Sequence, residues 1–338
     1  MNLRFFWKYH IYFSLKTMLK FCNILHFDFR KITLTPCSFS DFTCIDGSCV
    51  TLEQRCDGSA DCGDGSDEDD CKVFTSYSGY NKFLTPPPLG NDSTFLLNIS
   101  INIDEIIAID ETEGFFKIKM TLIRDWINTQ LTYQNLRRDS ARNMLSKEDI
   151  KRMWVPYTVL ENIEHEGEVK SSDKPLSIMI VANDDFSFKM DDRTNFRNTR
   201  LFEGDQNVLS YERQVTVNWI CNFNMRWYPF DLQNCKLEMY SKDAFLTMNP
   251  TDVRYVGPSQ LSQHYVKGVA ICACRINEKS GVIVQVILGR PLFGTIISVF
   301  MPTCVLLILS QMVMAFDKDH LEMVIEVNLT LLLVLSTL

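Results

Sequence analysis

Two groups of residues in this chain have the types and spacing needed for chemistry. The first is the stretch from Cys37 to Cys71, which contains six cysteines and ten Asp or Glu residues against one Arg, a net charge of −9. So many cysteines in so short a segment cannot surround an ordinary apolar core, so disulfides must hold it together, and the residues alone leave the pairing open. Dense negative charge repels nucleic acid and indicates a solvated face or a cation site.

The second group is a short loop closed by cysteines. Cys221 and Cys235 enclose thirteen residues. At the centre of the loop stand Tyr228, Pro229, Phe230 and Asp231. Two cysteines at this spacing could simply staple a hairpin, but the content of the loop resembles the signature loop of pentameric neurotransmitter-gated (Cys-loop) channels. The resemblance implies a Cys221–Cys235 disulfide and a loop that couples agonist binding to the pore.

The acidic segment also resembles a known module. Its run CDGSADCGDGSDEDDC is similar to the low-density-lipoprotein-receptor class A repeat, and the match covers residues 37–71. The resemblance implies the disulfides Cys37–Cys49, Cys44–Cys62 and Cys56–Cys71. It also implies one structural Ca²⁺, held by the carboxylates of Asp57, Asp61, Asp67 and Glu68 and by the backbone carbonyls of Gln54 and Ser59. Six hard oxygen ligands suit calcium. The alternative is a disordered acidic linker.

Composition indicates an exported protein. Twelve cysteines, nearly all before residue 291, would be unusual in a reducing cytosol. Asn91 and Asn98 both begin the tripeptide pattern of N-glycosylation. Residues 1–36 are apolar and aromatic but are interrupted by basic residues, so we expect a degraded export signal or a misassigned start.

The middle of the chain has the pattern of a β-sandwich. Residues 72–93 are rich in Gly and Pro and predict a linker. From 94 to 290, short alternating apolar runs recur between turns, which predicts an all-β, immunoglobulin-like sandwich. One short helix is expected at 147–153, where Ser146 to Asp149 form a capping box. The whole segment resembles the ligand-binding domain of the channel family.

The resemblance assigns positions to an agonist site between subunits. Trp126 and Leu131 match a strand on the complementary side, and Trp154 belongs to a turn on the principal side, where Tyr157 replaces the usual Asp. Core packing is the preferred interpretation of both tryptophans. Lys242 stands where the family usually has one wall of the aromatic box that attracts ammonium agonists.

These departures leave the agonist open. A proton, a metal ion or an acidic molecule facing Lys242 would each fit, whereas an acetylcholine-like or GABA-like ligand is not expected. Cys272 and Cys274 flank one alanine and could pair, stay free or bind a soft metal.

The C-terminal part predicts membrane helices. Residues 291–315 form an uncharged apolar stretch long enough to cross a bilayer, and with Arg290 they resemble the family's first transmembrane helix. A generic single-pass anchor is the alternative. A second helix is expected from Leu321. One face of it collects Glu326, Thr330, Leu333 and Thr337. This stripe would line a pore gated at Leu333, unless it packs against other helices.

Ion selectivity stays open. The segment aligns with GABA-type anion channels, yet it lacks the basic residue of their inner mouth, and Glu322 and Glu326 would favour cations. The family's third and fourth transmembrane helices do not appear, so we expect a C-terminally truncated sequence.

The sequence as a whole predicts a mixed multidomain fold: a disulfide-rich calcium module at 37–71, a β-sandwich, and transmembrane helices at 291–338. The expected function is gating rather than catalysis, as one subunit of a homo- or hetero-pentamer in the plasma membrane with an extracellular ectodomain. A small agonist would bind the sandwich, and the Cys221–Cys235 loop and the turn at 107–113 would press on the pore. The alternatives are a single-pass receptor or adhesion protein that captures a basic protein through the acidic repeat, and a secreted pentameric binding protein.

Overall fold

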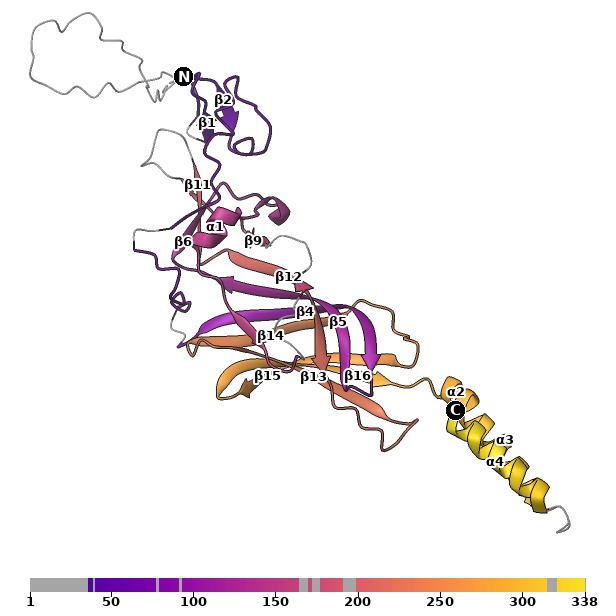
Figure 1. Ribbon diagram of the computed structural model, residues 1–338. Helices are drawn as coiled ribbons and strands as arrows, with labels where there is room; N and C mark the ends of the chain where they lie inside the picture. Colours follow the sequence, from indigo (N-terminus) through magenta and orange to yellow (C-terminus); the bar gives the residue numbers. More distant parts are fainter. Residues whose placement is uncertain are drawn as a thin grey trace, which may run out of the picture.

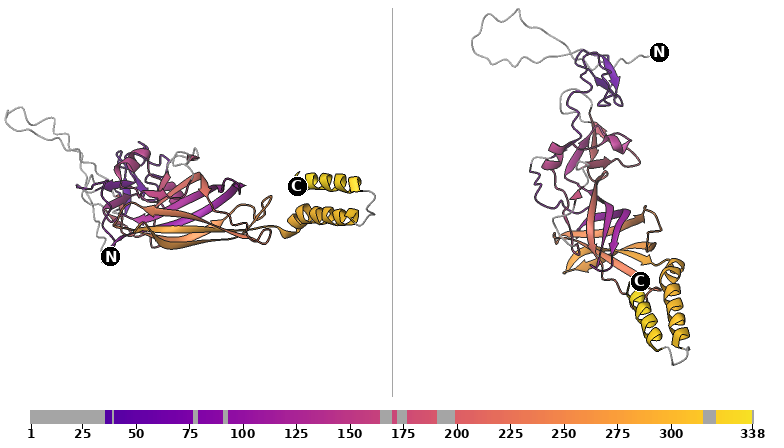
Figure 2. Two further views of the ribbon diagram at one scale, coloured as in Figure 1. Left: turned by 60° about the horizontal axis from the view of Figure 1, so that its bottom comes forward. Right: turned by 45° about the vertical axis from the view of Figure 1, so that its right-hand side comes forward.

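Three parts follow one another along the chain in the computed structural model (Figures 1 and 2). A small module at the N-terminal end is followed by a β-sandwich, and a pair of helices lies at the opposite end. The described residues are 36–38, 40–76, 79–90, 93–163, 170–171, 177–190, 199–314 and 321–337. Asn91 therefore lies outside the described residues.

Disulfides hold the small module together. Strands β1 (Asp41–Thr43) and β2 (Cys49–Thr51) form an antiparallel hairpin. The disulfides are Cys37–Cys49, Cys44–Cys62 and Cys56–Cys71, as the class A resemblance implies. The buried apolar cluster consists of Phe42, Cys44, Val50 and Cys62. Because this cluster is so small, the covalent cross-links must contribute most of the stability.

Two large sheets form the sandwich. The first contains β4 (Phe95–Asp110), β5 (Phe115–Ile127), β8 (Lys170–Ser171), β9 (Ser177–Val181), β12 (Val208–Ile220) and β14 (Leu246–Tyr255). Its order is β14-β4-β5-β12-β8, with β9 also paired to β12 and with β14 parallel to β4. The second contains β7 (Thr158–Leu160), β13 (Leu232–Ser241), β15 (Tyr265–Ile276) and β16 (Lys279–Gly289), in the order β15-β16-β13-β7.

A smaller sheet lies at the end of the sandwich that faces the module. It contains β3 (Phe74–Ser76), β6 (Leu131–Gln134), β10 (Lys189–Met190) and β11 (Arg200–Glu203), in the order β10-β11-β6-β3. Strand β3 falls inside the segment predicted as a linker. The strand predicted from Trp126 to Leu131 is wrong in one respect, because a turn after Ile127 divides it into β5 and β6.

Alternation of apolar residues positions the core between the sheets. Every second side chain of β4 from Phe95 to Ile103 is buried, as expected when one face of a strand packs inward. Trp219 of β12 stacks on Phe116 of β5 with ring centroids 4.6 Å apart. The predicted sandwich is confirmed.

Helices are few in the described part of the sandwich. The predicted short helix is present as α1 (Lys147–Arg152), after the 3₁₀ turn Ser140–Arg142. The Ser146 hydroxyl accepts a hydrogen bond from the Asp149 amide at 3.1 Å and so caps the first turn.

The C-terminal part forms two helical segments beside each other (Figure 2). The first consists of α2 (Leu292–Thr295), a π-helical turn (Ile296–Phe300) and α3 (Met301–Met314), and the second is α4 (Leu321–Thr337). The Ser310 hydroxyl lies 2.5 Å from Asn328 Oδ1 and joins α3 to α4. Among the residues that the structure describes, no helix is both long and apolar enough to span a membrane.

Candidate functional site

A cluster of buried charges lies where the sandwich meets the helices. Its members come from four separate segments of the chain. Arg290 lies between β16 and α2, Asp231 lies just before β13, Glu111 lies in the turn between β4 and β5, and His264 lies just before β15. Asp231 is held there by the Cys221–Cys235 disulfide, which is formed as predicted.

Arg290 joins these segments. Its Nε donates to both carboxylate oxygens of Asp231, at 2.9 and 3.1 Å, and its Nη2 donates to Glu111. The guanidinium also lies 4.8 Å from the ring centroid of Tyr228, at cation–π distance. His264 completes the cluster, with Nε2 at 2.8 Å from Glu111 Oε1. Arg290, Asp231 and His264 are 7%, 5% and 2% exposed.

The surroundings fix the charge states of the cluster. Burial opposes ionisation of Asp231, but hydrogen bonds from Arg290 and Gln233 hold its pKa below the usual range. Burial likewise opposes the charge of Arg290, but Asp231 and Glu111 raise its pKa. Burial and the Arg290 charge lower the pKa of His264, against the attraction of Glu111. At neutral pH the cluster is therefore a charged Arg–carboxylate group beside a neutral histidine.

The four residues at the centre of the disulfide loop occupy different environments. Asp231 is buried and Tyr228 packs on Arg290, whereas Phe230 is exposed at the tip. The tip and the first helical turns lie at the same end of the sandwich (Figure 1). Sequence reasoning named Asp231, Arg290 and the turn at 107–113, but it missed His264, which no local motif marks.

The tryptophans predicted at the agonist site pack in the core. The rings of Trp126 and Trp154 meet edge to face with centroids 6.2 Å apart, and Leu131 is also buried. Tyr80 supports this arrangement, because its hydroxyl accepts from the Trp154 amide at 2.7 Å. These contacts agree with the core-packing interpretation.

The two departures from the family pattern lie next to each other. The Lys242 ammonium is 5.8 Å from the ring centroid of Tyr157, and the Tyr157 side chain is 68% exposed. The pair therefore presents a cation and an aromatic ring to solvent at one place. Cys272 and Cys274 are unpaired in β15, and burial together with the nearby Cys272 raises the pKa of Cys274.

The module has oxygen atoms that fit a cation. Asp67 is fully buried, and its Oδ2 accepts from the Asp61 amide at 2.7 Å. Its Oδ1 and the Oε1 of Glu68 are buried and have no hydrogen-bond partner among the residues that the structure describes. Burial raises the pKa of Asp67, but hydrogen bonds from the Asp61 and Cys62 amides outweigh it and leave the pKa below its usual value. An ionised carboxylate with a buried free oxygen is suited to a metal ion.

Two of the other predicted calcium ligands already make hydrogen bonds within the module. The Asp57 carboxylate accepts from the Ser59 amide at 2.8 Å, and the Gln54 side chain accepts from the Thr51 amide at 2.9 Å. The Gln54 side chain is thus engaged within the module, and only its backbone carbonyl was predicted as a ligand. In the part of the chain that the structure describes, no three His, Cys, Asp or Glu side chains already form a metal site.

The module is seated on the sandwich through backbone atoms. The Arg137 guanidinium donates to the carbonyls of Glu53 and Arg55, at 2.9 and 3.0 Å. These carbonyls flank Gln54. One side chain of the sandwich therefore holds the segment that the class A resemblance assigns to calcium binding.

The described residues predicted for glycosylation and for the pore lie in β4 and α4. Asn98 lies in β4, where its Oδ1 accepts from Asn249 at 2.8 Å. Glu326, Thr330 and Leu333 are exposed on α4. Thr337 ends α4, and its side chain is outside the described set.

These features define a class: a receptor-type β-sandwich with a disulfide loop at the end where helices begin, preceded by a cross-linked acidic module. Comparison with known families agrees. The neurotransmitter-gated ion-channel ligand binding domain matches residues 72–257, and the low-density lipoprotein receptor domain class A matches residues 35–71. The first match covers more than half of the chain, which therefore belongs to the neurotransmitter-gated ion-channel family. Members of this family are ligand-gated channels and not enzymes.

Individual relatives are distant. The chain is 23% identical over 273 residues to the gamma-aminobutyric acid receptor subunit pi of Bos taurus, covering 77% of this chain and 55% of the relative. It is 20% identical over 284 residues to the glutamate-gated chloride channel of Drosophila melanogaster, covering 80% and 57%. The chain thus spans little more than half the length of these relatives. A stretch of 47 residues is 49% identical to SCO-spondin of Rattus norvegicus, covering 13% of this chain and 1% of the relative.

Proposed function

We propose that the chain is a subunit of a pentameric, extracellular ligand-gated ion channel of the plasma membrane. An agonist that binds the β-sandwich would open a pore formed by the C-terminal helices. The single observation that carries the proposal is the set of hydrogen-bonded ion pairs that Arg290 forms with Asp231 and Glu111. It ties the disulfide loop (Asp231) and the β4–β5 turn (Glu111) to the residue from which the chain enters α2.

The cluster supports a coupling role because it is buried and compensated. A change in the sandwich that displaces Asp231 or Glu111 would leave Arg290 without a counter-charge, which is costly away from water. The lower-energy response is for all three segments to move together. Movement of the binding domain would therefore be passed to the first helix through the Arg290 cluster.

We propose that residues 291–315 and α4 are the membrane segments and that α4 lines the pore. The polar side chains of Glu326 and Thr330 support the second point, because polar groups on an apolar helix are costly in lipid. Two known relatives are a GABA receptor subunit and a chloride channel, which favours anions, whereas Glu322 and Glu326 favour cations. A measured reversal potential must decide between them.

The agonist stays between a proton, a metal ion and an acidic molecule. The Lys242–Tyr157 pair supports the acidic molecule, because the Lys242 ammonium would attract its carboxylate and repel a cation.

For the module we propose a structural Ca²⁺ held by Asp57, Asp61, Asp67 and Glu68 and by the carbonyls of Gln54 and Ser59. Asp67 and Glu68 would supply oxygens that have no hydrogen-bond partner in the described residues.

Assembly and current measurements test the proposal. The full-length subunit, expressed in oocytes alone or with a related subunit, should reach the surface, cross-link as a pentamer and give ligand- or acid-evoked current. Arg290→Lys, which keeps a positive charge beside Asp231 but loses the two-pronged contact, should reduce the current while surface biotin labelling persists, and Glu326→Ala should shift the reversal potential. A surface-expressed protein that sediments only as a monomer would contradict the channel function.

A further inference from the structure

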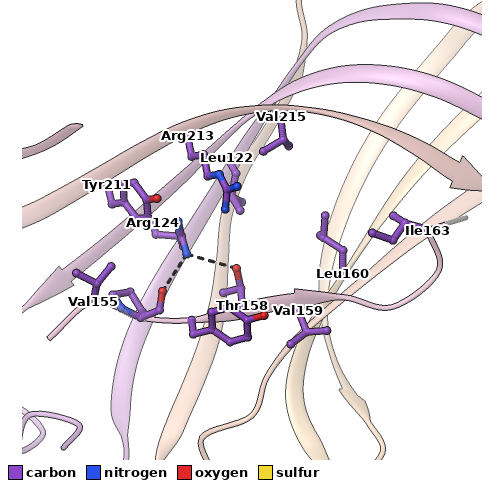
Figure 3. A pocket seen from close by; sticks show the side chains of 12 residues that line it. Leu122, Arg124, Val155, Thr158, Val159, Leu160, Ile163, Tyr211, Arg213 and Val215 are labelled. Carbon is purple, nitrogen blue, oxygen red and sulfur yellow. Dashed lines mark hydrogen bonds between the residues drawn. The ribbon is translucent and has the colours of Figure 1, made fainter. Parts of the chain in front are cut away.

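A second buried arginine lies in a different environment. A cavity of about 450 Å³ opens between β5, β12 and the segment 155–160 (Figure 3). Two arginines, Arg124 of β5 and Arg213 of β12, line it together with Tyr211. The rest of the wall is largely apolar and includes Leu122, Val155, Leu160, Ile163 and Val215.

Strand pairing places the two arginines on one face. In the antiparallel register, Arg124 lies opposite Tyr211 and Leu122 lies opposite Arg213. The two arginines are therefore diagonal neighbours on adjacent strands, and both point to the side that lines the cavity (Figure 3). Two like charges placed this way repel each other unless an anion lies between them.

Arg124 is only partly satisfied. It is 4% exposed, and it donates to the Pro156 carbonyl at 2.9 Å and to the Thr158 hydroxyl at 3.5 Å. Its guanidinium lies 3.9 Å from the Tyr211 ring centroid, and its buried Nε has no hydrogen-bond partner among the described residues. Burial lowers the pKa of Arg124 to about 10, so the group is still charged at neutral pH.

A carboxylate is missing from these contacts. Within the described residues, no Asp or Glu forms an ion pair with Arg124 or Arg213. A buried cation without a counter-charge is unfavourable unless something compensates it. Support of the Pro156 carbonyl and the Thr158 hydroxyl explains Arg124 at this place, but it does not explain Arg213.

We propose that this cavity binds a small amphipathic carboxylate within a single subunit. The carboxylate would lie between Arg124 and Arg213, since planar guanidinium groups bind carboxylates in a bidentate manner. The apolar body would pack against Leu122, Leu160 and Val215. The cavity volume suits a ligand of this size. Binding here does not require the chain to form a channel.

Direct binding to the purified full chain, in a mild non-ionic detergent, tests the proposal. Benzoate is the probe and benzamide is its neutral isostere, and calorimetry gives both dissociation constants. Benzoate should bind saturably, and benzamide should bind at least about tenfold more weakly, because it cannot compensate the arginines. Equal binding of the two would overturn the proposal.

A variant of the less buried arginine identifies the site. Arg213→Gln should weaken benzoate at least about tenfold, since one charge-assisted contact is lost. The control is Arg142→Gln, an exposed arginine outside the cavity whose replacement should leave benzoate affinity unchanged. Benzoate affinity that is unaltered in Arg213→Gln, measured on protein with a wild-type thermal unfolding profile, would overturn the assignment.

Absence of saturable benzoate binding to the purified chain would also overturn the proposal.

Discussion

Arg290 and Arg124 are both nearly inaccessible to solvent, yet the chain surrounds them differently. Arg290 contacts two carboxylates and an aromatic ring, whereas Arg124 has a backbone carbonyl, a hydroxyl and an aromatic ring. A fully compensated charge fixes the relative positions of the segments that hold it. A buried charge with no ion-pair partner among the described residues can accept an anion as its counter-ion. The same residue type therefore marks a joint at one place and a candidate binding site at another.

The largest expected effect concerns the charge cluster around Arg290. Arg290→Met should lower the free energy of unfolding of the sandwich by about 3–5 kcal/mol, because it leaves Asp231 buried without its partner. Urea titration followed by tryptophan fluorescence measures this, since Trp126 and Trp219 lie in the core. The exposed pair Arg254–Asp252 supplies the control, and Arg254→Met should cost less than about 1 kcal/mol. Similar losses in the two variants would contradict a compensated joint.

Calcium removal tests the module, where carboxylate oxygens rather than an arginine nitrogen are buried without a hydrogen-bond partner among the described residues. Asp67 and Glu68 have buried oxygens that lack a hydrogen-bond partner in the described part of the chain, and the same is true of Arg124 Nε. At a calcium concentration about a hundredfold above the dissociation constant, the ion should stabilise the module by roughly 2.7 kcal/mol. A chelator should then raise hydrogen exchange in residues 53–71 and leave β4 and β5 unchanged. Asp67→Asn should abolish this response, whereas the exposed Asp70→Asn should keep it. A response that survives in Asp67→Asn would exclude the proposed ligand.

Arg124→Met should have a smaller effect than Arg290→Met. The variant loses the hydrogen bond to the Pro156 carbonyl, which costs about 1–2 kcal/mol, but it also removes an uncompensated buried charge. The same urea titration measures the difference. A loss as large as that of Arg290→Met would mean that Arg124 is already compensated, and the comparison between the two arginines would fail.

The smallest effect is a dependence on pH. Because the folded-state pKa of His264 lies below its unfolded value near 6.5, the unfolded chain binds the proton first as the pH falls. Stability should therefore be complete above pH 6.5 and should decrease from there toward the folded pKa. His264→Gln should flatten this part of the stability curve. Asp231 acts in a separate window, since its contribution is lost only below its unfolded pKa near 3.8. An unchanged slope between wild type and His264→Gln would contradict the assigned protonation state.

Local patterns predicted much of the fold. Alternating apolar runs predicted the long strands, and the Ser146 cap predicted α1, because each depends on neighbouring residues alone. Pro250 interrupts the strand pattern of β14, and the chain accommodates this proline at a register shift between Pro250 and Asp252. The three module disulfides followed from a family resemblance and not from spacing.

The sites were less predictable because they depend on long-range contacts. Glu111 and His264 meet although more than 150 residues separate them, and no motif in either segment indicates the other. Arg124 was hidden for a different reason. It occupies an inward position in an apolar strand, where a single charged residue does not disturb the alternation. The Glu111–His264 contact and the position of Arg124 beside Arg213 could be seen only in the folded structure.

The seat of the module on Arg137 has an electrostatic consequence. The Arg137 guanidinium binds two backbone carbonyls, so this contact neutralises none of the carboxylates between Cys37 and Cys71. The module also lies at the end of the molecule opposite the helices (Figure 2). The net charge of −9 between Cys37 and Cys71 therefore lies at this end, and its field reaches about 8 Å into the solvent at physiological ionic strength. Cations and basic surfaces that approach from that side meet this field before they meet the sandwich.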